Sequence, residues 1–224
     1  MHGNNLKKVV LVGATGLVGS RLLDMFLADV TVERVVVLTR RELDIQHKRL
    51  ETILCDFTHP DQYAKQLRDF DILFCCIGTT MKNAGSRDAF LEVDYHIPMR
   101  LAAMASKAGI RKFIAISSLG ADPASSNFYL RTKGEMERDI DANYKFTKLA
   151  FVRPSLLLGP RKEFRLGEKF GQFFMVLFSF AMIGRFRKYR PIHDFNVAKA
   201  MISVSNSVNN QRVYESLELE WLGR

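Results

Sequence analysis

The feature that most constrains the fold of this chain is a glycine-spaced turn near its N-terminus. Apolar residues 9–12 are followed by Gly13, Gly16 and Gly19, and apolar residues at helical spacing come next. In a strand–turn–helix unit, the first glycine permits the tight turn and the second lets the backbone approach a pyrophosphate. The third lets helix and strand pack closely, and the helix start offers free N–H groups to phosphate oxygens. A turn whose glycines serve only packing is the alternative, but the strand, the spacing and the position favour phosphate binding.

Beyond the turn, short apolar runs alternate with amphipathic stretches. The apolar runs lie at residues 9–12, 35–38, 52–55, 72–77, 113–116 and 149–152, and helical spacing is found at 17–27, 61–67, 89–108 and 127–141. Apolar runs without polar alternation are typical of strands covered on both faces, and helices between them indicate βαβ units. The sequence therefore predicts an α/β protein with a doubly wound parallel sheet, the Rossmann fold. The long helix closes at Gly109 and contains Pro98, which can kink it.

The length of 224 residues fits one domain over 1–224, with no linker that would release a second one. Residues 155–224 are expected to include a small C-terminal extension at the substrate cleft, with helices at 167–183 and 196–204 and a strand at 213–215. The first of these helices is rich in Phe and Met. We interpret it as core or pocket wall, and peripheral contact with a membrane surface is the less favoured alternative.

The charge of the chain narrows the class of partner. The net charge is +9, with basic residues gathered at 185–190 and at Arg161 and Arg165. No nucleic-acid-binding motif accompanies these clusters, so nucleic acid is not an expected partner. A small-molecule substrate is expected instead, and Arg161 and Arg165 could hold a substrate anion or simply lie in a solvated loop.

Cysteine usage and the N-terminus bear on the location of the protein. Cys55, Cys75 and Cys76 lie in apolar runs without metal-binding spacing, so they are predicted to be buried, reduced thiols and not a metal site. No apolar run is long enough to span a bilayer, and the first residues lack a signal-peptide pattern. These observations predict a cytoplasmic location.

The end of the second predicted strand bears on the choice of dinucleotide. Where NAD-binding domains carry a carboxylate for the ribose 2′-hydroxyl, this chain has Arg40 and Arg41, and Glu42 comes too late. Guanidinium groups suit a 2′-phosphate, which a carboxylate would repel. The sequence therefore favours NADP(H) over NAD(H), with Arg40 the better candidate. A solvated basic turn is the alternative interpretation.

A second group of polar residues predicts the chemistry. Ser117 and Ser118 follow a buried strand, at the sheet edge where open α/β sheets bind ligands. Tyr129 and Lys133 are four residues apart and share one helix face. A lysine ammonium close to a phenol favours the phenolate, so Tyr129 could exchange a proton with a carbonyl or alcohol while hydride moves at a nicotinamide. A serine hydroxyl could hold the same oxygen.

These motifs together resemble those of an atypical, short member of the short-chain dehydrogenase/reductase superfamily. The matching pieces run over nearly the whole chain: the glycine turn, Arg40, Cys55-Asp56-Phe57, Cys76-Ile77-Gly78-Thr79, Ser117-Ser118, Tyr129-x-x-x-Lys133 and Val152-Arg153-Pro154. Residues 74–80, 117–122, 125–130 and 161–168 are more narrowly similar to the subgroup of Tat-interacting protein oxidoreductases.

The resemblance implies roles for particular residues. Tyr129 would be the acid/base, Lys133 would hold the nicotinamide ribose and tune Tyr129, and Ser118 would be the family serine, with Ser117 as the alternative. Asp56 and Phe57 would flank the adenine, and Pro154 would sit near the nicotinamide. The full set of expected cofactor-contacting residues is Gly13, Thr15, Gly16, Leu17, Val18, Gly19, Arg40, Arg41, Asp56, Phe57, Ile77, Gly78, Thr79, Ser117, Tyr129, Lys133 and Pro154.

The first hypothesis is an NADP(H)-dependent oxidoreductase acting on a small, apolar carbonyl or alcohol. A non-catalytic NADP(H)-binding redox sensor or partner-binding protein, and an epimerase or dehydratase, are the alternatives. The stretch after Tyr129 is shorter than in epimerases of the extended type, which disfavours a nucleotide-sugar substrate. Asp94 stands where many relatives have an asparagine, which could alter a proton relay. The helices at 89–108 and 127–141 would also allow a homodimer.

Overall fold

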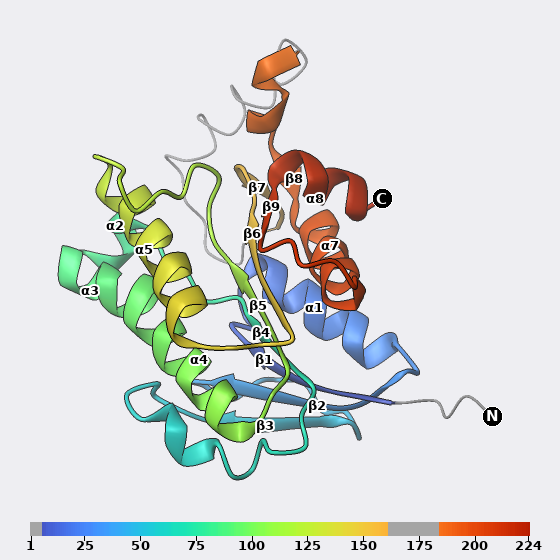
Figure 1. Ribbon diagram of the computed structural model, residues 1–224. Coiled ribbons are helices and arrows are strands. Elements are labelled where there is room, and N and C mark those ends of the chain that lie inside the picture. The colour runs from blue at the N-terminus through green and yellow to red at the C-terminus, as the bar shows by residue number, and fades with distance from the viewer. Residues whose placement is uncertain (1–5, 161–183) are drawn as a thin grey trace.

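The computed structural model describes residues 6–160 and 184–224. Seven strands form one sheet in the order β3-β2-β1-β4-β5-β6-β9, and every neighbouring pair is parallel. Their bounds are β1 Lys7–Val12, β2 Val32–Thr39, β3 Leu50–Leu54, β4 Ile72–Cys75, β5 Lys112–Ile116, β6 Lys148–Arg153 and β9 Val213–Glu215. The chain winds outward from β1 to β3 and then returns to β4 on the other side of β1 (Figure 1). The predicted Rossmann fold is confirmed, with its switch point between β1 and β4.

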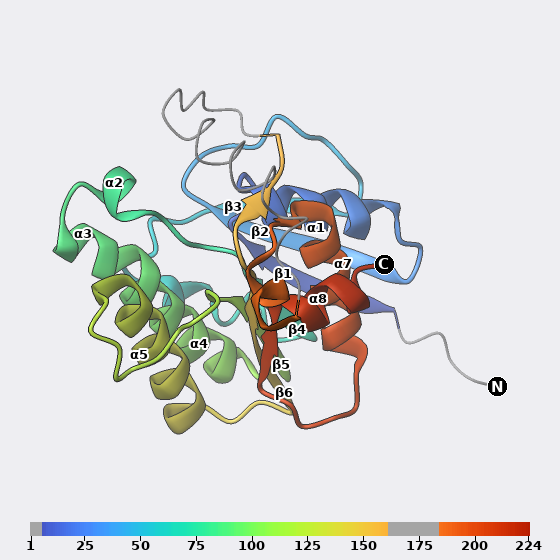
Figure 2. The same cartoon turned by 90° about the horizontal axis from the view of Figure 1, so that it is seen from above.

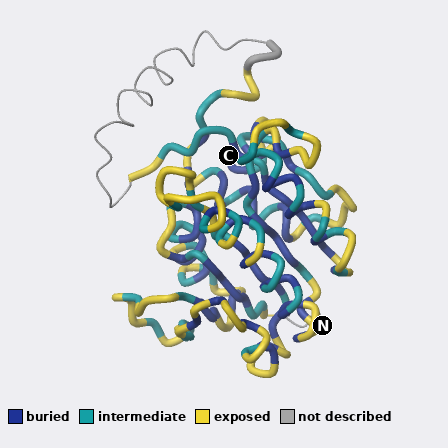
Figure 3. The backbone as a smooth tube through the Cα atoms, turned by 90° about the vertical axis from the view of Figure 1, so that its left-hand side faces the viewer, coloured by how far each residue is buried: buried dark blue, intermediate teal, exposed yellow. Residues whose placement is uncertain are grey.

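Helices cover both faces of the sheet (Figures 1 and 2). On one face lie α1 (Leu17–Ala28), α7 (Asp194–Asn206) and α8 (Ser216–Leu222), whose apolar residues share a core with β1, β2 and β4. On the other face, α4 (Ile97–Ala108) and α5 (Phe128–Asn143) enclose a second core. Figure 3 shows that the buried backbone, drawn in dark blue, runs through the interior of the fold. Strands covered on both faces explain the continuous apolar runs of the sequence.

The expected helix over 89–108 is interrupted in the structure. It consists of α3 (Arg87–Leu91), a π-helical segment η2 (Glu92–His96) and α4, in which Pro98 lies in the first turn. Proline has no N–H to donate, and its ring clashes with the carbonyl four residues earlier, here that of Asp94. The widened turn accommodates this, because the Ile97 N–H donates to Glu92 O, five residues back. Gly109 ends α4 with φ +79°, as predicted from its position.

Several short elements differ from the sequence expectations. Residues 61–67 give only the 3₁₀ turn η1 (Pro60–Tyr63), and α2 (Met81–Ala84) and α8 were not expected. The strands β7 (Leu157–Leu158) and β8 (Ile192–His193) pair with each other beside the main sheet, after the 3₁₀ turn η4 (Gly184–Tyr189). The helix expected at 167–183, with Arg161 and Arg165, lies outside the described residues.

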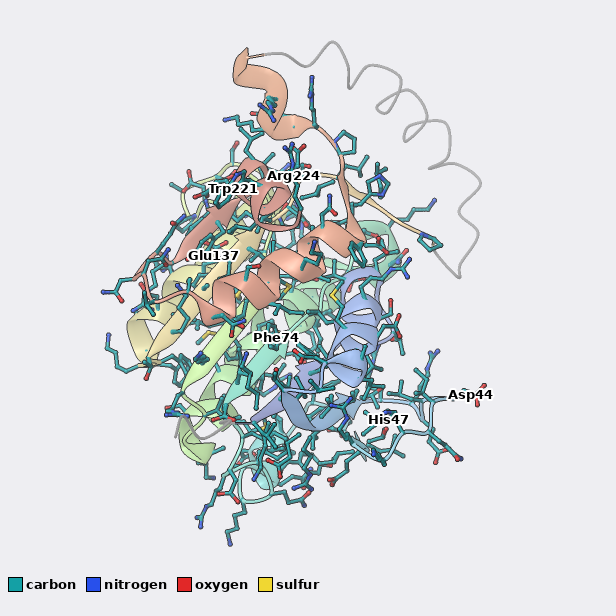
Figure 4. The ribbon with its side chains drawn as sticks, turned by 90° about the vertical axis from the view of Figure 1, so that its right-hand side faces the viewer. Asp44, His47, Phe74, Glu137, Trp221 and Arg224 are labelled. Carbon is teal, nitrogen blue, oxygen red and sulfur yellow. The ribbon has the colours of Figure 1, made fainter. Side chains whose placement is uncertain are left out.

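The C-terminal helix contrasts with the sheet that it covers. Figure 4 shows Phe74 of β4 inside the layers and Trp221 on α8 at the surface. Phe74 is fully buried against Phe26 of α1, whereas Trp221 is 72% exposed. Over residues 6–160 and 184–224, we find no helix that is long and apolar enough to cross a membrane.

Candidate active site

The glycine turn is built by close backbone contacts that leave no room for side chains. Gly13 has φ +87°, and a Cβ there would lie 2.5 Å from the carbonyl oxygen of Cys76. A Cβ on Gly19 would overlap the backbone of Gly13, lying 2.7 Å from its carbonyl carbon. The Gly16 N–H donates to Gly13 O at 3.0 Å and closes the turn. Both outer glycines therefore serve tight packing, and Gly16 is left exposed at the tip beside Thr15.

The start of α1 offers the donors that a pyrophosphate needs. Gly16 is the N-cap and contributes no side-chain cap, and the first turn of α1 carries no acidic residue. The Ser20 N–H makes the first intrahelical bond, to Gly16 O at 2.9 Å. The N–H groups of Leu17, Val18 and Gly19 precede that bond and point out of the positive end of the helix. This cradle fits a dinucleotide phosphate, as the sequence predicts.

The two arginines predicted to bind the 2′-phosphate of NADP(H) lie at the end of β2 and are exposed to solvent. Arg40 and Arg41 are exposed directly after β2, and the Arg41 N–H donates to Thr39 Oγ1 at 3.3 Å. The Thr39 hydroxyl in turn donates to Arg41 O at 3.0 Å and holds the turn. Both arginines therefore follow the carboxyl end of β2, on the same edge of the sheet as the glycine turn after β1.

The turn after β3 holds an unusual backbone conformation. Phe57 is buried and has φ +66°, a left-handed backbone value that residues other than glycine seldom adopt. The Arg100 guanidinium of α4 donates from Nε to Phe57 O at 2.8 Å, and Arg100 also pairs with Glu92. Asp56 is exposed and accepts a hydrogen bond from the Thr58 N–H at 2.9 Å. The turn after β3, which is expected to flank the adenine, is thus stabilised by Arg100 of α4.

The turn after β4 lies against buried charges. Ile77 is half-buried, Gly78 is exposed, and the Thr79 N–H donates to Asp94 Oδ2 at 2.8 Å. A Cβ on Gly78 would lie 3.3 Å from Asp94 Oδ1 and 3.6 Å from Lys133 Nζ. This turn is therefore linked through Asp94 to Lys133, the lysine predicted to hold the nicotinamide ribose.

The turn after β5 presents the two serines differently. Ser117 is buried, its N–H continues the ladder to Val152 O at 2.8 Å, and its hydroxyl has no hydrogen-bond partner among the described residues. Ser118 is half-buried, and within residues 6–160 and 184–224 its hydroxyl has only a long contact of 3.4 Å with Leu119 O. The Leu119 N–H donates to Pro154 O at 3.0 Å, so Pro154 lies beside this turn. Both serines remain candidates to hold a substrate oxygen.

Tyr129 and Lys133 lie one turn apart on α5. Asn127 caps the helix by accepting the Leu130 N–H at 3.2 Å, which places Tyr129 in the first turn. The ring of Phe90, which is fully buried, lies with its centroid 5.5 Å from that of Tyr129. Tyr129 itself is half-buried, so its ring is supported on one side and open on another.

Lys133 is 2% exposed, and its Nζ lies 2.6 Å from Asp94 Oδ1, an ion pair that is wholly enclosed. Burial lowers the pKa of Lys133, but the charge of Asp94 and the nearby Tyr129 raise it by more, so the net pKa lies above its usual value. The ammonium form is thereby maintained beside the phenol.

Sequence reasoning missed three supporting residues. From the sequence, Asp94 is only a departure from an asparagine, and neither Phe90 nor Arg100 carries any motif. The roles of Asp94 and Phe90 depend on how η2 and α3 lie along α5, and that of Arg100 depends on how α4 lies against the turn after β3; no local pattern encodes either arrangement. Pro98 is the one signal that could have indicated a local change of helix geometry at Asp94.

The cysteines, the search for metal ligands and a surface pocket add no further group to the site. Cys55 and Cys75 are buried free thiols, as expected, but Cys76 is only half-buried. No group of three or more potential metal ligands occurs in the described part of the chain. A shallow pocket of about 370 Å³, lined by residues that include Tyr214, Leu217 and Trp221, lies at α8, on the opposite face of the sheet from α5.

Comparison with known proteins agrees with this geometry. A sequence family described as NAD(P)H-binding matches residues 13–174. The chain is 36% identical over 165 residues to Protein HTATIP2 of Rattus norvegicus, covering 72% of this chain and 67% of that protein. It is 33% identical over 156 residues to Protein FMP52, mitochondrial, of Meyerozyma guilliermondii, covering 69% and 67%.

Solved structures support the fold. The UDP-N-acetylglucosamine 4-epimerase of Methanobrevibacter ruminantium, in complex with UDP-N-acetylmuramic acid, has a TM-score of 0.69 at 19% identity, covering 93% of this chain and 76% of that one. The Bordetella bronchiseptica enzyme WbmF, in complex with NAD+, has a TM-score of 0.68 at 14% identity, covering 96% and 76%. At these identities the likeness shows the fold alone.

The fold and the glycine turn define an NAD(P)-binding Rossmann protein. The chain belongs to the NAD(P)H-binding family, within the group that contains HTATIP2 and FMP52. The resemblance to the Tat-interacting protein oxidoreductases, inferred from the motifs, is confirmed.

The predicted cytoplasmic location is wrong. Several relatives at 33–35% identity, from three yeasts and Aspergillus fumigatus, are named as mitochondrial proteins. The prediction relied on the absence of a signal-peptide pattern in the first residues, and that pattern concerns the secretory route and not the mitochondrion.

Proposed function

We propose that this protein is an NADP(H)-dependent oxidoreductase that interconverts a small carbonyl compound and its alcohol. The observation that carries the proposal is the enclosed Asp94–Lys133 ion pair, 2.6 Å between Nζ and Oδ1, one helical turn from the half-buried Tyr129. An ammonium held charged beside a phenol suits proton exchange with a substrate oxygen.

The residues of the chain take distinct parts in this proposal. The N–H groups at the start of α1 hold the pyrophosphate, and Lys133 holds the nicotinamide ribose. A nicotinamide held there would supply the hydride for reduction of a carbonyl carbon, or would accept it in the reverse direction. In reduction, the Tyr129 hydroxyl gives its proton to the carbonyl oxygen, so that hydride and proton together make the alcohol. Ser118 or Ser117 donates a hydrogen bond to that oxygen and orients it.

The NADP(H) preference rests on the tip of β2. Arg40 and Arg41 are exposed there, and the second strand ends without a carboxylate. A guanidinium group attracts the additional phosphate of NADPH, and the carboxylate of Glu42 comes only after both arginines.

The first experiment is a fluorescence titration of the protein with NADPH and NADH, in parallel with Arg40→Ala. A charge-assisted hydrogen bond contributes about 1.5–3 kcal/mol, so the variant is expected to bind NADPH roughly ten to a hundred times more weakly. Its affinity for NADH should change little. Glu42→Ala is the matched control, since it alters the same loop without removing a cation. Equal affinity of the wild-type protein for the two nucleotides would refute the NADP(H) preference.

Turnover is tested on a panel of aldehydes and ketones with NADPH, using Tyr129→Phe as the acid/base variant. We expect the variant to bind NADPH normally and to lose at least about a hundredfold in kcat, the usual contribution of a positioned proton donor. Tight NADPH binding without reduction of any compound would favour a non-catalytic, NADP(H)-binding protein. Product formation without net consumption of the nucleotide would favour an epimerase or dehydratase.

A further inference from the structure

Asp94 is a buried carboxylate that joins two elements of the site. Its side chain is fully buried, and its two oxygens lie against different elements, one in an ion pair and the other in a hydrogen bond. Oδ1 lies 2.6 Å from Lys133 Nζ on α5, and Oδ2 accepts the Thr79 N–H of the turn after β4 at 2.8 Å. A buried charge is costly unless it is paired, so this double engagement accounts for the presence of a carboxylate here.

The position of Asp94 follows from the interruption of its helix. It lies in η2, where the Ile97 N–H reaches back to Glu92 O, and Pro98 cannot donate to the Asp94 carbonyl. The next residue, Tyr95, also bonds α5, since its hydroxyl donates to Asp139 at 2.7 Å. Adjacent residues of a regular α-helix do not face the same way. The widened turn instead allows both to reach α5, which runs alongside (Figures 1 and 2).

Three groups face Lys133, and Asp94 contributes most to keeping its amine charged. They are Asp94 from η2, Tyr129 from α5 and Cys75 from β4. Burial raises the pKa of the Cys75 thiol to about 11, so it stays neutral and offers no countercharge at neutral pH. Among these three groups, Asp94 is the one that forms an ion pair with the ammonium, at 2.6 Å, and its charge is the largest influence raising the pKa of Lys133.

We propose that Asp94 is a positioning residue that holds the Lys133 ammonium and the Thr79 amide together, so that α5 and the turn after β4 meet the nucleotide as one unit. Gly78 permits this arrangement, because a Cβ there would come within 3.3 Å of the carboxylate and 3.6 Å of the ammonium. The inference rests on the proposed function only in treating Lys133 as the group that holds the ribose.

The test compares Asp94→Asn with Asp139→Asn. The first variant keeps the size of the side chain and an oxygen for the Thr79 N–H, but it removes the charge beside Lys133. The second removes a carboxylate from the same helix contact while leaving Lys133 untouched. Lys133 is titrated through its ¹³Cε resonance, assigned with Lys133→Met, and NADPH affinity is measured at pH 6 and pH 9.

We expect Asp94→Asn to lower the titration midpoint of Lys133 by about one to three pH units, the size of the effect of a neighbouring opposite charge. NADPH affinity should then fall roughly tenfold at pH 9, where the amine has become neutral, and less at pH 6. Asp139→Asn should leave both readouts unchanged. An unshifted Lys133 midpoint, or the same loss of NADPH affinity at both pH values, would overturn the proposal.

A double variant separates positioning from a purely structural role. Asp94→Asn combined with Lys133→Met removes both charges, so it leaves no unpaired ion in the interior and should fold even where Asp94→Asn alone does not. If Asp94 acts through Lys133, the double variant binds NADPH as Lys133→Met does. If the double variant bound NADPH tenfold more weakly than Lys133→Met, Asp94 would act independently of Lys133, and the proposal would be overturned. The Lys133 titration needs no substrate, so a protein that reduces nothing would refute the proposed reaction and leave this result intact.

Discussion

The glycine turn after β1 and the charged cluster on α5 serve the same expected cofactor, but they are built in opposite ways. The turn is made of backbone contacts within seven consecutive residues from Gly13 to Gly19, and its precision comes from the lack of a side chain at the points of closest approach, Gly13 and Gly19. The cluster is made of side chains from separate elements, with Asp94 and Lys133 enclosed and paired at 2.6 Å. Substitutions in the glycine turn should therefore disturb it sterically, at any pH. Substitutions in the charged cluster should act through electrostatics, so their effects should depend on pH.

The largest effect should come from a methyl group in the turn. In Gly19→Ala, the new Cβ would lie 2.7 Å from the Gly13 carbonyl carbon, and it would also meet Ala14. Backbone atoms cannot move aside as a flexible side chain can, so we expect a loss of more than about 4 kcal/mol in the free energy of unfolding, beyond the usual cost of overpacking. Urea denaturation monitored by circular dichroism measures it.

Gly109→Ala is the matched control for that prediction. Gly109 has φ +79° but has no atom within 4 Å of its added Cβ, so only backbone strain remains, about 1–2 kcal/mol. Similar losses at the two positions would show that close packing is not what the turn depends on.

An intermediate effect is expected from the aromatic support of Tyr129. Phe90 is fully buried, with its ring centroid 5.5 Å from Tyr129 and 5.8 Å from Phe128. Phe90→Ala should cost about 3 kcal/mol of stability, since it leaves a cavity under both rings. Phe90→Leu retains most of the volume and should cost less than about 1.5 kcal/mol. Thermal unfolding by calorimetry compares the two, and equal losses would argue against a packing role.

The same comparison explains how much of the molecule the sequence could predict. The sheet, the glycine turn and the position of Gly109 rest on local chemistry, because glycine freedom and apolar periodicity act within a few residues. The ends of β1 and α1 were accordingly placed within one or two residues.

The parts that the sequence could not predict depend on contacts between distant segments. Pro98 signals a disturbed helix, but whether it gives a kink or a widened turn depends on what α5 offers to η2. The partnership of Asp94 with Lys133 therefore has no local signature, and the same holds for the bond from Arg100 to Phe57 O. The short strands β7 and β8 are two residues each, which is too short for periodicity to reveal.

The smallest predicted effect concerns a second polar contact between η2 and α5, next to the Asp94–Lys133 ion pair. Tyr95 donates a hydrogen bond to Asp139 at 2.7 Å, and this bond, followed by burial, raises the pKa of Tyr95 from 10.0 to about 12. Tyr95→Phe should cost about 1 kcal/mol, because Asp139 keeps Arg138 as a partner and is not left alone.

The pH dependence of that cost follows from the direction of the shift. A tyrosine whose pKa is higher in the folded state than in the unfolded state stabilises the fold fully below the unfolded value, and this contribution is lost as the pH rises through the folded value. The stability gap between the wild-type protein and Tyr95→Phe should thus be constant up to about pH 10 and narrow towards pH 12. Urea denaturation at pH 8, 9.5 and 11 measures the gap. If the gap were already closed at pH 8, the hydrogen bond to Asp139 would not contribute to stability, and the contact between η2 and α5 would depend on Asp94 and packing alone.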